Sequence, residues 1–104
     1  MTTPVRPSSF AQDEIEHHLR EYESASPGLG DKLWADTQTV VTLISEYPEI
    51  GEVVRRTRGL VRRFPLRHFP FFLIYRRRSD HLQIVALAHT SRKPGYWRSR
   101  LQFE

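Results

Sequence analysis

Two neighbouring segments, 69–77 and 82–89, carry apolar side chains on both faces of a strand, and this constrains the fold more than any other feature. Their period of two is typical of β-strands, and residues 78–81 join them as a hairpin. On the first segment the two faces are Phe69, Phe71, Leu73 and Tyr75 against Phe72 and Ile74. On the second they are Leu82, Ile84, Ala86 and Ala88 against Val85 and Leu87. A sheet that is apolar on both faces needs a cover on each side.

Two helices are predicted before these strands. The first begins at residues 8–12, where Ser9 can cap the helix and Gln12 can return the hydrogen bond, and it ends near Ser24. Its apolar positions are Ala11, Ile15, Leu19 and Tyr22, and we place Asp13, Glu14, Glu16, Glu21 and Glu23 on the opposite side. After a turn at 26–30 the second helix spans about 31–47, and Pro48 ends it. So short a connection predicts an antiparallel pair.

The order of elements indicates the α+β class. We expect an N-terminal antiparallel helix hairpin packed on one face of a small antiparallel sheet, followed by a short C-terminal tail or helix. Residues 60–66 add a third strand, and residues 1–7, with Pro4 and Pro7, allow a short edge-like strand. A chain of 104 residues predicts a single domain over 1–104.

The helix hairpin can cover only one face of this sheet, so the cover of the other face stays open. An uncovered apolar face is typical of a surface that binds a partner. Alternatively, the tail around Tyr96 and Trp97 folds back over it.

Charge divides the chain into two halves. Residues 1–52 contain 3 Lys or Arg and 10 Asp or Glu, a balance of −7, whereas residues 53–104 contain 13 and 2, a balance of +11. Fourteen of the sixteen cationic residues are Arg. The planar guanidinium group binds phosphate and carboxylate well, so this composition favours a polyanionic partner such as a nucleic acid or an acidic protein segment.

Composition also excludes several classes of site. Cysteine is absent, which excludes disulfides and thiolate metal sites, and the adjacent His17 and His18 point about 100° apart on a helix. We expect no metal and no cofactor. Neither the apolar run 69–75 nor the start 1–7 resembles a membrane span or a signal peptide, so we expect a soluble, cytoplasmic protein with no membrane partner.

Several short motifs, taken together, resemble the RelE/ParE superfamily of type II toxin–antitoxin toxins. They are Ala11-x-x-Glu14-Ile15, Tyr22 before the turn at 26–30, Pro48, Arg63-Phe64-Pro65, the strand ending at Tyr75, and His89-x-x-Arg92-x-Pro94. The resemblance implies a microbial-RNase-like α+β fold. It also implies a cognate antitoxin, usually acidic and partly disordered when free, that forms a hetero-oligomer with the toxin.

Two activities occur in this superfamily. ParE-like members act on DNA gyrase, and RelE-like members are ribosome-dependent endoribonucleases that cut mRNA. The ending His89-x-x-Arg92 resembles the ParE branch, and the catalytic lysines typical of RelE are missing, because the only lysines are Lys32 and Lys93. We therefore expect gyrase as the target, with the ribosome and mRNA as the alternative.

The candidate site residues follow from these two alternatives. A nuclease would need Arg63, Arg67 and Arg92 to stabilise charge on phosphorus, with the acid and base drawn from His68, His89 and Tyr96. Arg63 and Arg67 share strand parity, which would place them on one side. In the alternative, these two arginines bind antitoxin carboxylates and His89 lies in the core. The predicted partner-binding set is Arg63, Arg67, Phe72, Ile74, Arg76, Val85, Arg92 and Trp97.

Overall fold

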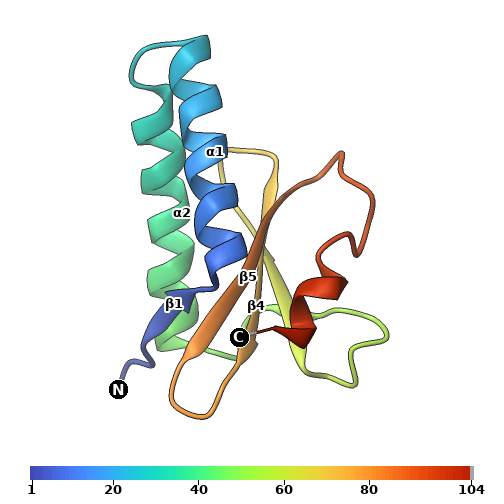
Figure 1. The fold of residues 1–104 in the computed structure, drawn as a ribbon. Coiled ribbons are helices and arrows are strands. Elements are labelled where there is room, and N and C mark those ends of the chain that lie inside the picture. Colours follow the sequence, from blue (N-terminus) through green and yellow to red (C-terminus); the bar gives the residue numbers. More distant parts are fainter. Residues whose placement is uncertain (104) are drawn as a thin grey trace.

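The computed structural model describes residues 1–103, so residue 104 of the predicted domain lies outside the described residues. Two helices pack on one face of a five-stranded sheet (Figure 1), which confirms the predicted α+β class. The elements in chain order are β1 (Val5–Pro7), α1 (Ser9–Ala25), α2 (Leu29–Glu46), β2 (Glu52–Val53), β3 (Val61–Pro65), β4 (Phe71–Arg77), β5 (Leu82–His89) and the 3₁₀ helix η1 (Arg98–Gln102).

The sheet has the strand order β1-β5-β4-β3-β2. β1 pairs with β5 in parallel, and all other pairs are antiparallel, so the sheet is mixed rather than purely antiparallel. The edge strand predicted within residues 1–7 is present as β1, whereas β2 was not predicted. Two residues are too few to carry a period of two, which explains why the sequence gives no sign of β2.

The two helices begin and end close to their predicted positions. Ser8 caps α1, not Ser9 as predicted, because the Ser8 hydroxyl oxygen accepts a hydrogen bond from the backbone N–H of Ala11 at 3.1 Å. Gly28 precedes α2 with φ +88°, a conformation that favours glycine. The Glu23 carboxylate accepts hydrogen bonds from the backbone N–H groups of Gly28 and Gly30, at 2.9 and 3.0 Å, and so holds the turn.

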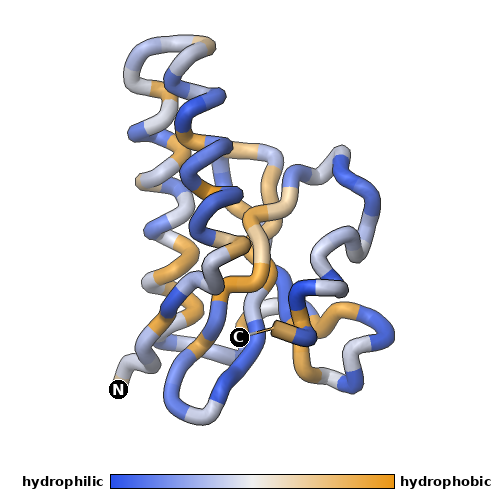
Figure 2. Tube along the Cα trace, viewed as in Figure 1, coloured by the Kyte–Doolittle hydropathy of each residue, from blue (hydrophilic) through white to orange (hydrophobic). Residues whose placement is uncertain are grey.

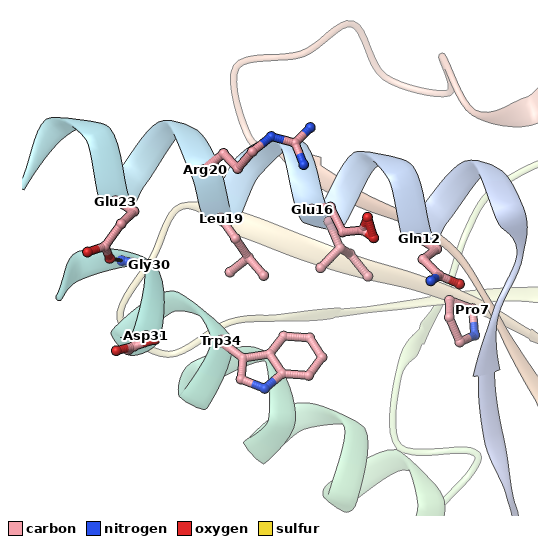
Figure 3. Close-up of a pocket in the computed structure, with 10 residues that line it drawn as sticks. Pro7, Gln12, Glu16, Leu19, Arg20, Glu23, Gly30, Asp31 and Trp34 are labelled. Atoms are coloured by element: carbon pink, nitrogen blue, oxygen red, sulfur yellow. Dashed lines mark hydrogen bonds between the residues drawn. The ribbon is translucent and has the colours of Figure 1, made fainter. Parts of the chain in front are cut away.

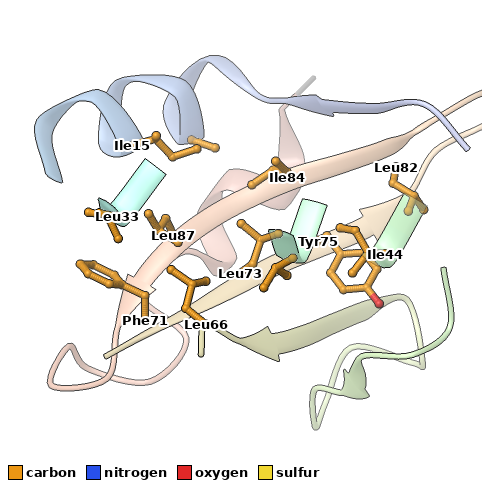
Figure 4. Close-up of a cluster of buried hydrophobic side chains, with 12 residues drawn as sticks. Ile15, Leu33, Ile44, Leu66, Phe71, Leu73, Tyr75, Leu82, Ile84 and Leu87 are labelled. Atoms are coloured by element: carbon orange, nitrogen blue, oxygen red, sulfur yellow. The ribbon is translucent and has the colours of Figure 1, made fainter. Parts of the chain in front are cut away.

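The main core lies between the helices and the sheet (Figure 4). Its buried residues are Ala11, Ile15, Leu33, Val40, Ile44, Leu66, Phe71, Leu73, Tyr75, Leu82, Ile84 and Leu87. Tyr75 is 1 % exposed, and its hydroxyl donates to the carbonyl oxygen of Pro48 and accepts from the N–H of Gly51, both at 2.9 Å. These two hydrogen bonds fix the segment that leads from α2 into β2.

A β-bulge changes which side chains of β5 face the helices. Tyr75 pairs with Ile84, but Ile74 pairs with Ala86, so Val85 is an extra residue in β5. After the bulge the parity reverses: Leu87 joins the helix-side core, and Ala86 and Ala88 join the opposite face. The predicted assignment of Ala86, Leu87 and Ala88 was therefore wrong.

The C-terminal segment covers most of the second face of the sheet (Figure 1). Trp97 is 4 % exposed and packs in a second buried cluster with Val61, Ile74, Val85, Ala86 and Ala88. The hydropathy of the trace shows apolar residues along the central strands and hydrophilic residues along much of the tail (Figure 2). The sequence left two alternatives for the cover of this face, a partner or the chain's own tail, and in the structure the tail lies on it.

Candidate functional site

A groove of about 390 Å³ remains on the second face, between the C-terminal tail and the segment from β2 to β3. Half-buried Phe72 and buried Ile74 and Ala88 contribute its apolar lining. Five cationic side chains line it, namely Arg55, Arg63, Arg92, Lys93 and Arg98. Glu52 is the one carboxylate among the lining residues. The groove is thus strongly basic.

Three guanidinium groups of the groove lie over aromatic rings. Arg92 lies 3.9 Å from the centroid of the Tyr96 ring. Arg63 lies 4.6 Å from the Phe72 centroid and Arg98 lies 5.3 Å from that of Trp97. Each such contact contributes about 0.5–1 kcal/mol at an exposed site. The rings therefore hold the cations in place while leaving their positive charge in the groove.

Arg98 ties the two walls of the groove together. Its Nη2 donates to the carbonyl oxygen of Arg55 at 2.8 Å and its Nη1 donates to that of Arg56 at 3.2 Å. Arg56 and Arg58 have φ values of +61° and +57°, a region that residues other than glycine rarely adopt. The guanidinium of the tail thus holds a strained loop between β2 and β3 in one conformation.

A polar network under the tail anchors it to α1 and β5. The Glu14 carboxylate pairs with the Arg100 guanidinium and accepts the Tyr96 hydroxyl proton at 2.6 Å and the Leu87 N–H at 3.1 Å. Arg100 also donates to the carbonyl oxygen of Val85 at 3.0 Å. Burial raises the pKa of Tyr96, and the hydrogen bond and negative charge of Glu14 raise it further. Tyr96 therefore stays a neutral hydrogen-bond donor.

The placement of Glu14 corrects the prediction that it faces away from the apolar side of α1. Glu14 is three residues after Ala11, so it lies within about 60° of Ala11 around the helix axis. Helical spacing alone does not distinguish Glu14, because Glu23 lies about 40° and Glu16 about 60° from Leu19 by the same measure.

His89 lies half-buried at the edge of the groove. Its Nδ1 accepts the backbone N–H of Ser91 at 3.0 Å and lies 2.7 Å from the Ser91 hydroxyl. This pattern assigns the proton of the neutral ring to Nε2. In that tautomer His89 has no free basic nitrogen directed at a ligand.

The structure brings together four of the five predicted catalytic residues. Arg63, His89, Arg92 and Tyr96 line the groove, whereas Arg67 does not. β3 ends at Pro65, and the backbone N–H of His68 donates to Asp36 of α2 at 2.7 Å. The chain has therefore left the strand before Arg67, and the expected shared side of Arg63 and Arg67 was wrong. His68 also lies outside the lining of the groove.

The predicted partner-binding residues divide into exposed and buried groups. Arg63, Arg67 and Arg92 are exposed and Phe72 is half-buried. Ile74 and Val85 are buried under the tail and Trp97 is the buried tail residue that covers them, so none of the three is exposed in this conformation. Arg76 donates to the side chain of Gln83 and to the carbonyl oxygens of Leu101 and Phe103, so its donors hold the tail.

Four charged lining residues lie outside the predicted site set: Glu52, Arg55, Lys93 and Arg98. Lys93 follows Arg92 and Arg98 follows Trp97, and Arg92 and Trp97 were both predicted site residues. The basic residues of the tail could therefore have identified Lys93 and Arg98 as candidates. The backbone carbonyl of Arg55 accepts a hydrogen bond from Arg98, which is 43 positions away in sequence. This contact could not be predicted without the fold.

A second hollow, of about 640 Å³, lies between the two helices (Figure 3). Leu19 and Trp34 face the space between α1 and α2, and Glu16 and Arg20 lie along α1. Within residues 1–103 no three His or carboxylate side chains are grouped as metal ligands would be. Nor does this part of the chain contain a helix with the length and apolar character of a membrane span.

Comparison with known proteins agrees with this architecture. One solved structure, described as the chromosomal ParDE TA system from P. aeruginosa, superposes with a TM-score of 0.74 at 16% sequence identity, over 86% of this chain and 98% of that chain. No curated protein gives a match. The family described as "ParE toxin of type II toxin-antitoxin system, parDE" matches residues 5–94. The chain therefore belongs to the ParE toxin family of type II toxin–antitoxin systems.

Proposed function

We propose that this ParE-family toxin arrests growth in the cytoplasm by binding DNA gyrase, and that a cognate antitoxin neutralises it. The observation that carries the proposal is a basic groove in which charge is abundant but free acid and base groups are not. Arg92 and Lys93 are exposed and, within residues 1–103, pair with no carboxylate. Such a surface is suited to binding a macromolecule.

The alternative, ribosome-dependent mRNA cleavage, has weaker support from the same groove. Attack by a ribose 2′-hydroxyl needs a base and an acid close to the phosphate. The neutral Tyr96 hydroxyl donates its hydrogen bond to Glu14, and His89 uses Nδ1 to accept from Ser91. Arginine cannot serve as acid or base, since its pKa is too high.

Two assays with purified protein separate the targets. We expect inhibition of gyrase supercoiling, with accumulation of gyrase-cleaved DNA, and no new cuts when translated mRNA is mapped by primer extension. Cut mRNA without an effect on gyrase would support the RelE-like alternative. If neither effect occurs and expression without an antitoxin leaves growth unchanged, the proposal is wrong.

Arg92→Ala is the most informative variant for this proposal. Arg92 is exposed, so its removal should leave the fold intact, and we expect at least a ~10-fold loss of gyrase inhibition. Arg20→Ala removes the same charge from an exposed position of α1 outside the groove and serves as the matched control. Equal activity of the two variants would exclude Arg92 from the target contact.

The antitoxin is proposed to be an acidic, partly disordered chain that folds on the toxin. Exposed Arg63, Arg67 and Arg92 and half-buried Phe72 remain its proposed contacts. Co-expression of the neighbouring open reading frame should restore growth and co-purify with the toxin.

A further inference from the structure

We infer that the basic groove binds a single strand of nucleic acid directly, through its phosphates and bases, without cleaving it. The inference goes beyond gyrase binding, because it assigns a ligand to the isolated protein. Its first support is charge: both walls carry cations, Arg55 and Arg63 on one and Arg92 and Lys93 on the other. A strand lying between them would place successive phosphates near cations and release counterions.

The second support is the state of these cations. Within residues 1–103, no carboxylate pairs with Arg55, Arg92 or Lys93. Arg63 does pair with Glu52 at 2.7 Å, but both side chains are largely exposed, so the pair is weak and a phosphate can replace the carboxylate.

The third support is the shape of the guanidinium contacts. Arg92 lies over the Tyr96 ring and Arg63 over the Phe72 ring. A base can stack on such planar groups whatever its sequence, as occurs in proteins that bind single strands. The cations also surround a hollow, which receives one strand more readily than the convex surface of a duplex.

For a ligand of the groove alone, the buried state of the second cluster favours a nucleic acid over a short acidic peptide. The longer antitoxin can also contact surface outside the groove, such as that of Arg67. A peptide that folds on its partner gains much of its affinity from apolar side chains entering apolar pockets. Here Trp97 has already filled that role, since Trp97 and Ile74 are only 4 % and 3 % exposed. What remains open to a ligand is a shallow lining that includes the Phe72 ring, with cations on both walls.

The groove is also held ready for a ligand. Arg98 bridges the carbonyl oxygens of Arg55 and Arg56, and Tyr96 is fixed by Glu14. Little ordering of the walls is therefore needed on binding, which lowers the entropy lost.

The test is fluorescence anisotropy with labelled 12-mers, in the absence of gyrase: oligo-dT, oligo-rU, a DNA duplex and a glutamate-rich peptide. We expect both single strands to bind more tightly than the duplex or the peptide. With about four phosphate contacts, affinity for a single strand should fall about 50-fold between 50 and 200 mM salt. The ratio of the DNA and RNA affinities shows whether a 2′-hydroxyl on the sugar strengthens or weakens binding.

Three variants localise the binding. Arg92→Ala should weaken binding about 10-fold and reduce the salt slope by about 0.7. Arg20→Ala, at an exposed position of α1 outside the groove, should change neither by more than about 2-fold. Glu52→Gln removes the carboxylate of the groove and should tighten binding, whereas Glu49→Gln, outside the groove, should not. Misfolding would weaken binding rather than tighten it. A gain of affinity in Glu52→Gln but not in Glu49→Gln therefore assigns the effect to the groove.

Several results would overturn the inference. They are equal effects of Arg92→Ala and Arg20→Ala, tighter binding of the glutamate-rich peptide than of either strand, or degradation of the strand during the assay. The gyrase proposal is tested separately by supercoiling, so either can fail while the other stands.

Discussion

Glu14 of α1 and Arg100 of η1 form a two-pronged ion pair although they are 86 positions apart in sequence. The distances are 2.9 Å from Nη1 to Oε1 and 3.2 Å from Nη2 to Oε2. Both side chains are largely buried, with 10 % and 18 % exposed. The pair joins the beginning of the helix hairpin to the end of the tail.

Glu14→Ala should lower the free energy of unfolding by about 3 kcal/mol, because it leaves a mostly buried guanidinium without its carboxylate. The Leu87 N–H also loses its acceptor. Urea denaturation measures the change. Glu16→Ala, on the exposed side of the same helix, should cost less than about 0.5 kcal/mol. Equal stability of the two variants would mean that the pair contributes nothing.

Trp97→Ala should destabilise the protein by about 3–5 kcal/mol, since Trp97 fills the centre of the second cluster. The variant should also bind a hydrophobic dye more strongly, because the sheet face under the tail becomes accessible. Trp34→Ala provides the comparison, because Trp34 is 44 % exposed. We expect it to cost about 1 kcal/mol. A similar loss in both variants would argue against an anchoring role for Trp97.

Tyr75→Phe should cost about 1–3 kcal/mol, because the Gly51 N–H and the Pro48 carbonyl both lose their hydrogen-bond partner in a buried place. Gly51→Ala should also destabilise, since a Cβ there would lie 2.6 Å from the Tyr75 hydroxyl oxygen and 2.9 Å from the Arg63 carbonyl oxygen. Thermal unfolding measures both. Tyr47→Phe, at an exposed tyrosine, should leave the melting temperature unchanged.

The stability of the protein should fall as pH falls below about 6.5, and His18 should account for part of the loss. Burial lowers the pKa of His18 from its usual 6.5, although Glu14, a hydrogen bond to the backbone of Leu87 and Glu21 oppose the shift. The unfolded chain therefore takes up the proton at a higher pH than the folded chain does. The stability is complete above the unfolded pKa and is lost as pH falls through the folded pKa.

This pH dependence is measured by urea denaturation at pH 8 and pH 5. His18→Leu should lose less stability over that interval than the unmodified protein, whereas His17→Leu, at an exposed position, should lose as much. If the His18 variant has an unchanged slope, another group accounts for the pH dependence.

The sequence predicts most of the fold because the helices and the two long strands have strong periods. Three features escaped it for physical reasons. β2 has two residues and no pattern. The bulge at Val85 contains neither glycine nor proline, so nothing marks the reversal of parity after Ile84. The sheet is mixed because β1 pairs in parallel with β5, and this pairing depends on tertiary contacts rather than on a local sequence pattern.

The candidate site could be predicted only in part. Arg92 and Tyr96 are close in sequence, and their contact follows from the compact turn between them. The meeting of Arg98 with the loop between β2 and β3, and of Glu14 with Tyr96, depends on how the tail folds back. A helical projection places Glu14 beside Ala11, but it does not separate Glu14 from Glu16 and Glu23, which lie beside Leu19, and it does not give its partners.

The position of Trp97 also has a consequence for how the protein responds to proteolysis. Cleavage before Trp97 would remove the side chain that covers Val61, Ile74 and Val85. The product would expose an apolar sheet face and would aggregate more readily than the intact chain.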